Sequence, residues 1–433
     1  MRNFISAIAL CLSFVIANAQ NALPVISDVK LSADAAKQVV TVTYNLADPD
    51  NDALKVDVML SNDNGNSFLI KPTNVSGDAG QSVTKGKNKK LSFSYSPQQF
   101  PALSAMKVKL VANDLYKINV QELVDQVDSV RVRKNVERIY GERHLSTEQG
   151  KQQLENTRKL LMTAFTGSNL QAGIQDTRMG ELPVRNVIAK KPGTNELDVY
   201  IVCAHYDAVE KSPGADDNAS GVAALMEIAT ILSKYNFSST IKFIGFDLEE
   251  AGSAGARVYI AERASREPDR LMGVVNFDMI GYYSDAEKSQ SVPPGFETLF
   301  PKSYEKVAKD GFRGNFILIT ANERSKFLAD EFEKAGGQYV PSLKSVSAVL
   351  IGKGEAVPPM RSGDHGEFWE FEVPAINIGD GANTRNKHYH AQSDVLETLN
   401  YPFMVNVIKA SLAMIVKMAQ VEHSTVVVKG FEQ

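Results

Sequence analysis

The spacing of apolar residues changes at about residue 132, and this change divides the chain into two parts. Between residues 24 and 132, short runs alternate apolar with polar residues, most clearly at 39–44, 54–60 and 106–111. Alternation with a period of two predicts half-buried strands, and clusters of turn-forming Asp, Asn, Gly and Pro separate the runs. We therefore predict a small all-β sandwich, immunoglobulin-like or fibronectin-like, over residues 20–132.

After residue 132, helical and strand patterns alternate. Ser146 and Gln149 are spaced as in a capping box, and Leu154, Leu161 and Phe165 then recur at helical spacing. Largely apolar runs that predict buried strands lie at 197–204, 240–246, 272–277, 316–319 and 374–378. Helical stretches lie at 219–235, 252–264, 325–334 and 401–421. The alternation predicts an α/β fold over residues 133–433, in three layers with a mainly parallel central sheet.

The first residues have the features of a secretory signal. Met1 and Arg2 precede an apolar stretch over residues 4–16 and the small-residue sequence Ala17-Asn18-Ala19. The apolar stretch is shorter than the roughly 20 residues that span a bilayer, so we expect a signal peptide over 1–19 rather than a membrane span. Cleavage near Ala19 predicts a secreted or periplasmic protein. It leaves Cys203 as the remaining cysteine, so an intramolecular disulfide is excluded.

Composition narrows the possible partners. The chain has 433 residues, a formal charge of -4 and a hydrophobic content of 43%, enough for two buried cores. The acidic balance provides no basic surface for phosphates, which argues against a nucleic-acid partner. The sequence does not indicate an oligomeric state.

Polar residues that can bind metal follow the predicted strands. They are His205-Tyr206-Asp207, Asp216-Asp217-Asn218, Glu249-Glu250, Asp278 and His388-Tyr389-His390. Ligands bind at the carboxyl ends of strands in open α/β sheets, so these residues are expected at one sheet edge. Two imidazoles with several carboxylates suit zinc, and one carboxylate can bridge two ions about 3.5 to 4 Å apart. The pattern predicts a dinuclear zinc site.

The predicted chemistry is metal-assisted hydrolysis. Two ions acidify a bridging water and polarise a carbonyl, while a carboxylate that binds no metal moves the proton. The adjacent Glu249-Glu250 pair can supply both a ligand and a proton carrier. Taken singly, each motif has an ordinary structural interpretation, such as an N-cap at Asp216-Asp217 or a solvated His388 and His390. Their common position after strands, in a chain with six histidines, favours a site.

The same residues resemble a known family. The segments that carry the resemblance, in order and spacing, are 205–207, 213–221, 246–250, 276–279 and 389–390. They are similar to the M28 family of zinc aminopeptidases over roughly the last two-thirds of the chain. The resemblance implies a phosphorylase/hydrolase-like domain and a bacterial secreted metallopeptidase. Such an enzyme carries two zinc ions per chain and removes N-terminal residues from peptides that have a free N-terminus.

The resemblance also implies a role for each matching residue. Asp217 bridges the two zinc ions, Glu249 is the general base, and Asp207 orients the ring of His205. The remaining ligands are His205 and Asp278 for one ion, and Glu250 and His390 for the other. The family pattern places the bridging ligand just before Asn-Ala-Ser-Gly, whereas the sequence alone leaves Asp216 as an alternative.

One segment departs from the family pattern. Ser362-Gly363-Asp364-His365 contains a glycine that the Ser-Asp-His of many relatives lacks, so Asp364 and His365 receive no role. The same fold also occurs in carboxypeptidases and in mono-zinc glutaminyl cyclases, and these two activities are the alternatives among enzymes. A non-catalytic binding ectodomain is the alternative from another class, although substituted ligands are expected there and none is missing here. Substrate side-chain preference and the role of the sandwich are not indicated.

Overall fold

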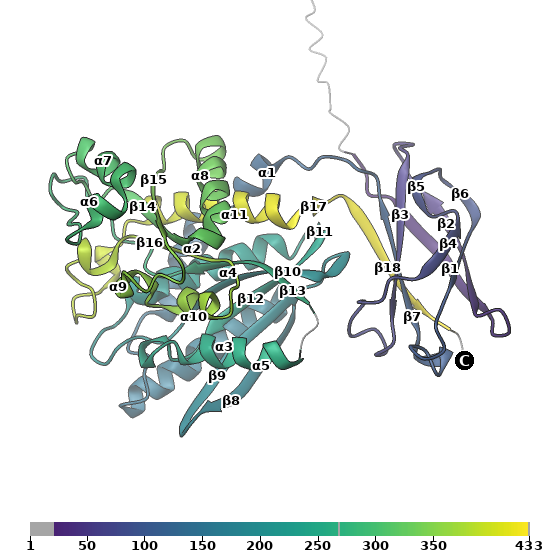
Figure 1. The fold of residues 1–433 in the computed structure, drawn as a ribbon, viewed down its shortest axis with the longest axis horizontal. Coiled ribbons are helices and arrows are strands. Elements are labelled where there is room, and N and C mark those ends of the chain that lie inside the picture. The colour runs from purple at the N-terminus through teal and green to yellow at the C-terminus, as the bar shows by residue number, and fades with distance from the viewer. Residues whose placement is uncertain (1–20, 267–268, 432–433) are drawn as a thin grey trace, which may run out of the picture.

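The computed structural model describes residues 21–266 and 269–431, and the predicted signal peptide lies outside these ranges. Two units lie side by side (Figure 1). The smaller unit is a sandwich of two antiparallel sheets, with strand orders β1-β2-β6-β4 and β18-β7-β3-β5. Its strands are β1 (Val25–Asp34), β2 (Val39–Ala47), β3 (Leu54–Ser61), β4 (Thr73–Gly77), β5 (Gly80–Val83), β6 (Gly86–Ser94), β7 (Lys107–Asn113) and β18 (Ser424–Gly430).

The period-two runs of the sequence form the inner faces of this sandwich. In β2, Val40, Val42, Tyr44 and Leu46 are buried, while the residues between them are partly exposed. The runs predicted at 54–60 and 106–111 correspond to β3 and β7. Side chains from both sheets meet in one hydrophobic cluster, which confirms the predicted all-β module.

The larger unit is built on an eight-stranded mixed sheet with the order β15-β14-β16-β13-β10-β12-β9-β8. The strands are β8 (Gln171–Met179), β9 (Leu182–Lys191), β10 (Asn195–His205), β12 (Ser239–Phe246), β13 (Arg270–Phe277), β14 (Phe316–Asn322), β15 (Lys344–Leu350) and β16 (Ala375–Gly379). The centre of the sheet, β16-β13-β10-β12, is parallel as predicted. The pairs β14-β16, β12-β9 and β9-β8 are antiparallel.

Helices cover both faces of this sheet (Figure 1). One face packs against α2 (Ser129–Ile139), α3 (Glu148–Gly167), α4 (Gly221–Leu232), α8 (Lys326–Tyr339) and α11 (Tyr401–Ala419). The other face packs against α5 (Ala254–Arg266), α6 (Phe296–Leu299) and α10 (Asp364–Glu370), and α7 (Pro301–Lys309) lies beside β15. β10 contributes to both cores, with Val202 on one face and Ile201 on the other. The three predicted layers are therefore confirmed.

The start of α3 differs from the predicted capping box. Thr147, rather than Ser146, is the N-cap, and its Oγ1 accepts a hydrogen bond from Gly150 N at 3.0 Å. Ser146 N instead donates to His144 Nδ1. The helix therefore starts one residue later than the Ser146–Gln149 pattern indicates, because the extended backbone of Thr147 places its hydroxyl over the first turn.

The predicted division at residue 132 does not coincide with the boundary between the two units. Leu123 and Val124 of α1 (Val120–Val124), with Val132 of α2, belong to the core of the larger unit although they lie within residues 20–132, the range predicted for the sandwich. At the other end of the chain, β18 pairs antiparallel with β7 and so completes a sheet of the sandwich. The sandwich is thus assembled from both ends of the described chain.

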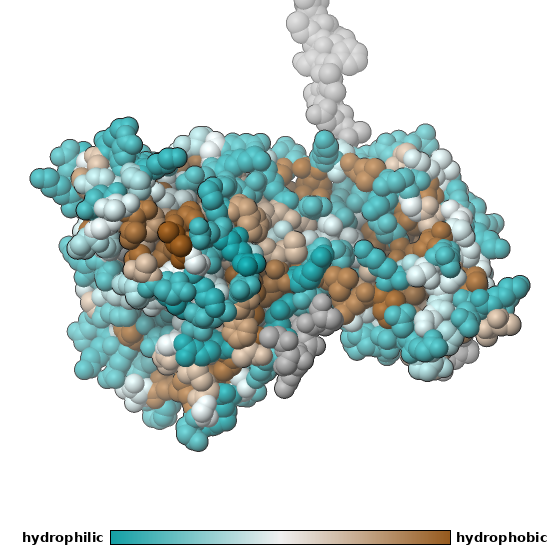
Figure 2. Space-filling model, in the orientation of Figure 1, coloured by the Kyte–Doolittle hydropathy of each residue, from teal (hydrophilic) through white to brown (hydrophobic). Residues whose placement is uncertain are grey.

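A buried ion pair joins the two units. Lys109 Nζ on β7 lies 2.8 Å from Glu196 Oε1 on β10, and it donates to Gly193 O at 3.1 Å. Lys190 Nζ contacts the other carboxylate oxygen of Glu196 at 2.7 Å. The side chains of Lys109 and Glu196 are 5% and 3% exposed, so the pair lies in the interior of the contact between the sandwich and the larger unit. On the face drawn in Figure 2, hydrophobic residues also gather along this junction.

Helix α11 is apolar enough to cross a membrane by length and composition, and within the described residues it is the one helix with this property. Of its most apolar window, 67% is buried inside the protein. Its residues Met404, Val407 and Ile408 lie in the core of the larger unit. The hydropathy of α11 is thus accounted for by core packing.

Candidate metal centre

The carboxyl ends of four strands meet at one edge of the large sheet. In the register of the parallel pairs, His205 of β10 lies opposite Phe246 of β12, and Phe277 of β13 lies opposite Ile378 of β16. The chain that follows β12 carries Glu249, and Asp278 directly follows β13. The segment before α4 brings Asp217 to the same edge. Sheet topology therefore gathers residues that are far apart in sequence.

The predicted ligands form two groups that share Asp217. In the first group, His205 Nε2 lies 3.5 Å from Asp217 Oδ1 and 3.5 Å from Asp278 Oδ1. In the second, His390 Nε2 lies 3.2 Å from Asp217 Oδ2 and 3.3 Å from Glu250 Oε2. Within each group the donor atoms all lie within 4.8 Å of one another. The two oxygens of one carboxylate thus face two different histidines.

These spacings fit zinc. Four donors about 2.1 Å from one ion in a tetrahedron are about 3.4 Å from each other, close to the separations in both groups. Glu250 Oε1 is buried without a hydrogen-bond partner, as expected for an oxygen that binds something other than protein. Each group supplies three donors, which leaves one position for water or substrate, the arrangement typical of catalytic zinc.

The cluster also has an excess of negative charge that bound cations would neutralise. Burial raises the pKa of Asp217 to about 7 and raises the pKa of Glu249 well above its usual range. Hydrogen bonds to carboxylates raise the pKa of His390 to about 10. Burial lowers the pKa of His205, but neighbouring carboxylates outweigh burial and raise it overall. Negative charge is therefore in excess here, and cations are the groups that relieve it.

Asp207 lies behind this cluster and holds two of its parts. Its Oδ1 is 3.3 Å from His205 Nδ1 and accepts a hydrogen bond from Glu249 N at 3.0 Å. Its Oδ2 accepts from Glu250 N at 3.1 Å. A carboxylate on Nδ1 leaves Nε2 of His205 free to face the cluster. Asp207 thus orients the ring and anchors the acidic pair through its backbone.

A second carboxylate, Asp394, was not predicted from the sequence. Its Oδ1 accepts from Asp216 N at 2.9 Å, and its Oδ2 accepts from Asp217 N at 3.0 Å. Arg143 was also missed. It is fully buried, and its guanidinium donates to carbonyl oxygens that include those of Tyr206 and Gly214. No motif marks either residue, because their partners are backbone atoms, most of them in segments distant in sequence.

The other sequence candidates lie outside the two groups. Asp216 accepts from Gly281 N and from Asn386 Nδ2, each at 2.8 Å, so its oxygens are engaged away from the histidines. His388 Nδ1 lies 2.8 Å from Ser393 Oγ. His365 is buried, with Nε2 3.1 Å from Met360 O, and burial lowers its pKa to about 4. Both oxygens of Asp364 are buried without a hydrogen-bond partner.

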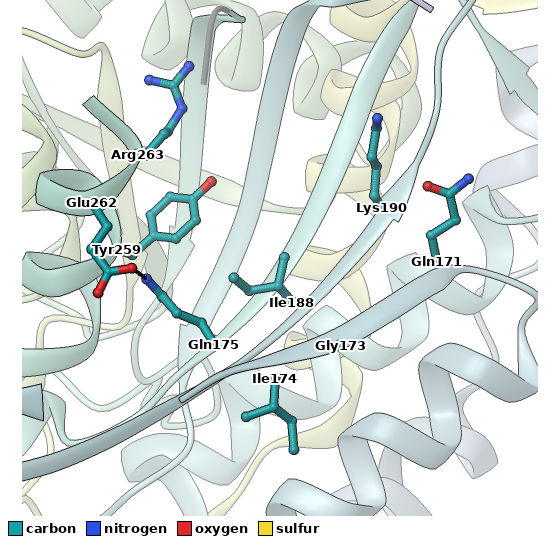
Figure 3. A pocket seen from close by; sticks show the side chains of 9 residues that line it. All are labelled: Gln171, Gly173, Ile174, Gln175, Ile188, Lys190, Tyr259, Glu262 and Arg263. Atoms are coloured by element: carbon teal, nitrogen blue, oxygen red, sulfur yellow. Dashed lines mark hydrogen bonds between the residues drawn. The ribbon is translucent and has the colours of Figure 1, made fainter. Parts of the chain in front are cut away.

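The cluster opens into a pocket of about 860 Å³. His205, Asp217, Glu249, Glu250, Asp278 and His390 form one part of its wall, and mostly apolar residues form another. Among the described residues that line this pocket there is no Lys or Arg. A separate cavity of about 410 Å³ lies between β8, β9 and α5, where Gln175 Nε2 donates to Glu262 Oε2 (Figure 3). None of the metal-binding candidates lines that smaller cavity.

Solved structures share this fold. The LapA aminopeptidase of Legionella pneumophila matches with a TM-score of 0.52 and 19% identity, covering 71% of this chain and 77% of that one. The aminopeptidase from Aneurinibacillus sp. strain AM-1 matches with a TM-score of 0.53 and 15% identity, covering 70% and 97%. At these identities the likeness shows the fold alone, which this chain shares with both aminopeptidases.

Sequence comparison then gives the family. The model of peptidase family M28 matches residues 186–415, more than half of the chain. The uncharacterized protein YfbL of Escherichia coli K12 is 28% identical over 276 residues, which cover 60% of this chain and 80% of that protein. A probable zinc metalloprotease of Pyrenophora tritici-repentis is 28% identical over 263 residues, but the match spans only 52% of its length. The chain belongs to peptidase family M28.

Proposed function

We propose that this protein is a di-zinc aminopeptidase that acts outside the cytoplasm. The observation that carries the proposal is the pair of three-donor groups sharing Asp217, which face a pocket without a cationic side chain among its described residues. Relatives point the same way, since one of Aspergillus oryzae is named probable leucine aminopeptidase 2 and one of Bacillus subtilis is named aminopeptidase YwaD.

The charges around the pocket select which end of a peptide binds. A carboxypeptidase requires a cation to hold the terminal carboxylate of its substrate, and the described pocket lining supplies no Lys or Arg. The pocket therefore favours a free N-terminus over a free C-terminus.

Each residue of the cluster would have a defined task in this reaction. His205 and Asp278 would hold one zinc ion, Glu250 and His390 the other, and Asp217 would bind both. Bound zinc lowers the pKa of water and polarises the carbonyl of the peptide bond. Glu249 would accept the proton of the attacking water and deliver it to the departing amine, since it lines the pocket and belongs to neither of the two groups that share Asp217. Asp207 keeps His205 and Glu249 in position.

Two other functions make different predictions. A glutaminyl cyclase of this fold uses one zinc ion, whereas here two donor groups of three residues each are present. A binding ectodomain that has lost catalysis has no use for a proton carrier, yet the carboxylate of Glu249 lines the pocket beside the donor groups. The complete set of donors and base favours the aminopeptidase.

We also propose export, with removal of the signal peptide near Ala19. Intact-mass measurement of the protein made with its full leader, in cells and in the extracellular or periplasmic fraction, tests this. The exported form is expected to begin at Gln20, and an exported form that retains Met1 contradicts removal.

Aminoacyl chromogenic substrates test the activity itself. We expect the purified protein to release the chromophore from substrates with a free α-amino group and to leave the same substrates untouched when the amine is acetylated. Equal hydrolysis of free and acetylated substrates contradicts an aminopeptidase. Hydrolysis restricted to peptides with a free C-terminus supports the carboxypeptidase instead.

A further inference from the structure

β8 is the last strand of the large sheet and has one free edge. Within the described residues it pairs with β9 and with no other strand. The pairing runs from Gln171–Lys190 to Met179–Leu182 without a register shift, and none of the nine residues of β8 is fully buried. In such a strand, the backbone N–H and C=O groups that do not face the partner strand point outward. The outer edge of β8 therefore offers a row of backbone donors and acceptors.

The sequence of β8 gives this edge little protection. Exposed edge strands are usually protected by Lys, by Pro or by a β-bulge. β8 contains neither Lys nor Pro, and its register with β9 is regular. Its two charged residues, Asp176 and Arg178, lie toward the turn that leads to β9, so residues 171–175 are uncharged. This half of the edge can pair with another strand.

A cavity opens beside the uncharged half of β8. This β8 cavity has a volume of about 410 Å³, and Gly173, Ile188 and Tyr259 are among the residues that line it (Figure 3). Apart from its chain neighbours, a Cβ atom at Gly173 would meet no heavy atom within 4 Å. The backbone of Gly173 also lacks the positive φ that favours glycine. Glycine weakens a strand and often marks the close approach of another group, which is the explanation that remains for Gly173.

The β8 cavity presents mainly apolar surface to an incoming group. Its charged side chains already contact other groups of the protein: Lys190 contacts Glu196, Arg263 contacts Asp269, and Glu262 contacts Gln175 and Thr177. The side chain of Ile188 and the ring of Tyr259 supply the apolar surface. A large apolar side chain would be buried there, and an aromatic one would also pack against the ring of Tyr259.

We propose that the free edge of β8 binds an extended segment of another polypeptide, which adds a strand to the sheet and places an aromatic side chain over Gly173. Residues directly opposite each other in paired strands have Cβ atoms about 4.5–5.5 Å apart, on the same face. An aromatic residue opposite an edge glycine covers that glycine and stabilises the pair. Backbone hydrogen bonds supply the affinity and the β8 cavity supplies the specificity.

A second copy of this chain is a less suitable occupant. β8 contains no aromatic residue, so two paired β8 strands would leave both cavities unfilled. The partner is therefore a different segment, recognised by one aromatic residue within an uncharged extended stretch.

Fluorescence anisotropy with defined probes tests the proposal. One probe is the peptide acetyl-Thr-Val-Thr-Phe-Thr-Val-Thr, labelled at its carboxyl end, and the other has Gly in place of Phe. The purified protein is expected to bind the Phe probe at least about tenfold more tightly. N-methylation of alternate amides should abolish binding on one edge of the probe and not on the other, since one edge pairs with β8. Equal binding of the two probes, or no binding, overturns the proposal.

Gly173→Val locates the binding in the β8 cavity. Valine has room there and suits a strand, so the variant is expected to fold and to keep the activity on aminoacyl substrates. It should weaken binding of the Phe probe at least about tenfold. Arg178→Val is the matched control, because Arg178 is an exposed residue of the same strand outside the cavity lining, and this variant should keep the affinity.

Two results contradict this assignment. Unchanged binding of the Phe probe by Gly173→Val would mean that the probe binds elsewhere. Sedimentation that shows a concentration-dependent dimer of the unchanged protein, lost in Gly173→Val, would assign the edge to a second copy of the chain and overturn the proposal.

Discussion

Replacing Asp394 by Asn tests whether the backbone of the bridging ligand is held in place by a carboxylate. Asp394 is fully buried and accepts two hydrogen bonds, from Asp216 N and Asp217 N. Asparagine has nearly the same shape but only one acceptor oxygen, so its amide group faces one of the two N–H groups. The backbone N–H that faces this amide group loses its acceptor, and it meets a second hydrogen-bond donor, the amide NH2 of the asparagine.

The size of the effect follows from this count. A hydrogen bond to a charged group contributes about 1.5–3 kcal/mol, and Asp394→Asn removes one of two such bonds. We expect the free energy of unfolding of the metal-free protein to fall by about that amount. Since Asp217 is the carboxylate shared by both groups, its displacement should also weaken zinc binding about 10- to 100-fold, the range for groups that support metal ligands.

Urea unfolding of the metal-free protein and zinc titration against a chromophoric chelator measure the two effects separately. Glu227→Gln is the control, because Glu227 is a fully buried carboxylate on α4 that pairs with Arg131 and lies outside every metal-binding group. The control should lower stability without changing zinc affinity. If Asp394→Asn binds zinc as tightly as the unchanged protein, Asp394 does not position the ligand and the reasoning fails.

Three further predictions follow. Glu249→Gln should retain both zinc ions in metal analysis but lower kcat about 100- to 10,000-fold, and an unchanged kcat assigns the proton transfer elsewhere. Glu196→Gln should lower the free energy of unfolding by about 3–5 kcal/mol, because it leaves Lys109 buried without its partner. Burial raises the pKa of Glu196, but Lys109 and Lys190 together outweigh burial and lower it below 4.5, so this contribution is present above about pH 4.5. It should disappear as the pH falls through the lowered pKa, and urea titrations that show no such pH dependence contradict the pairing. Val427→Thr should lower stability by about 1 kcal/mol or more in urea titrations, whereas Val428→Thr should have little effect, because only Val427 packs against the sandwich core. Equal effects contradict this role of β18.

The layers and the metal-binding candidates could be predicted because their signals are local. Strands such as β10 and β12 are short apolar runs, and the residue after each run necessarily lies at the carboxyl edge of a parallel sheet. The order of His205, Asp217, Glu249 and Asp278 along the chain therefore carries spatial information. The structure brings all of them together with His390.

The missed features depend on contacts between distant segments. β18 joins the sandwich by pairing with β7, more than 300 residues earlier in the chain. Its sequence alone is equally compatible with a place in the larger unit, after α11. Asp394 acts on backbone N–H groups 177 and 178 residues away, and such contacts leave no pattern of residue types. The choice between Asp216 and Asp217 likewise depends on which carboxylate turns toward the histidines, a property of backbone conformation rather than of composition.

Metal content measured together with activity tests the central proposal most directly. The purified protein should contain two zinc ions per chain by mass spectrometry of its metals and should lose aminopeptidase activity when a chelator removes them. Added zinc should restore activity in proportion to the ions bound. Full activity with one ion or none per chain would contradict a centre in which Asp217 joins two metals.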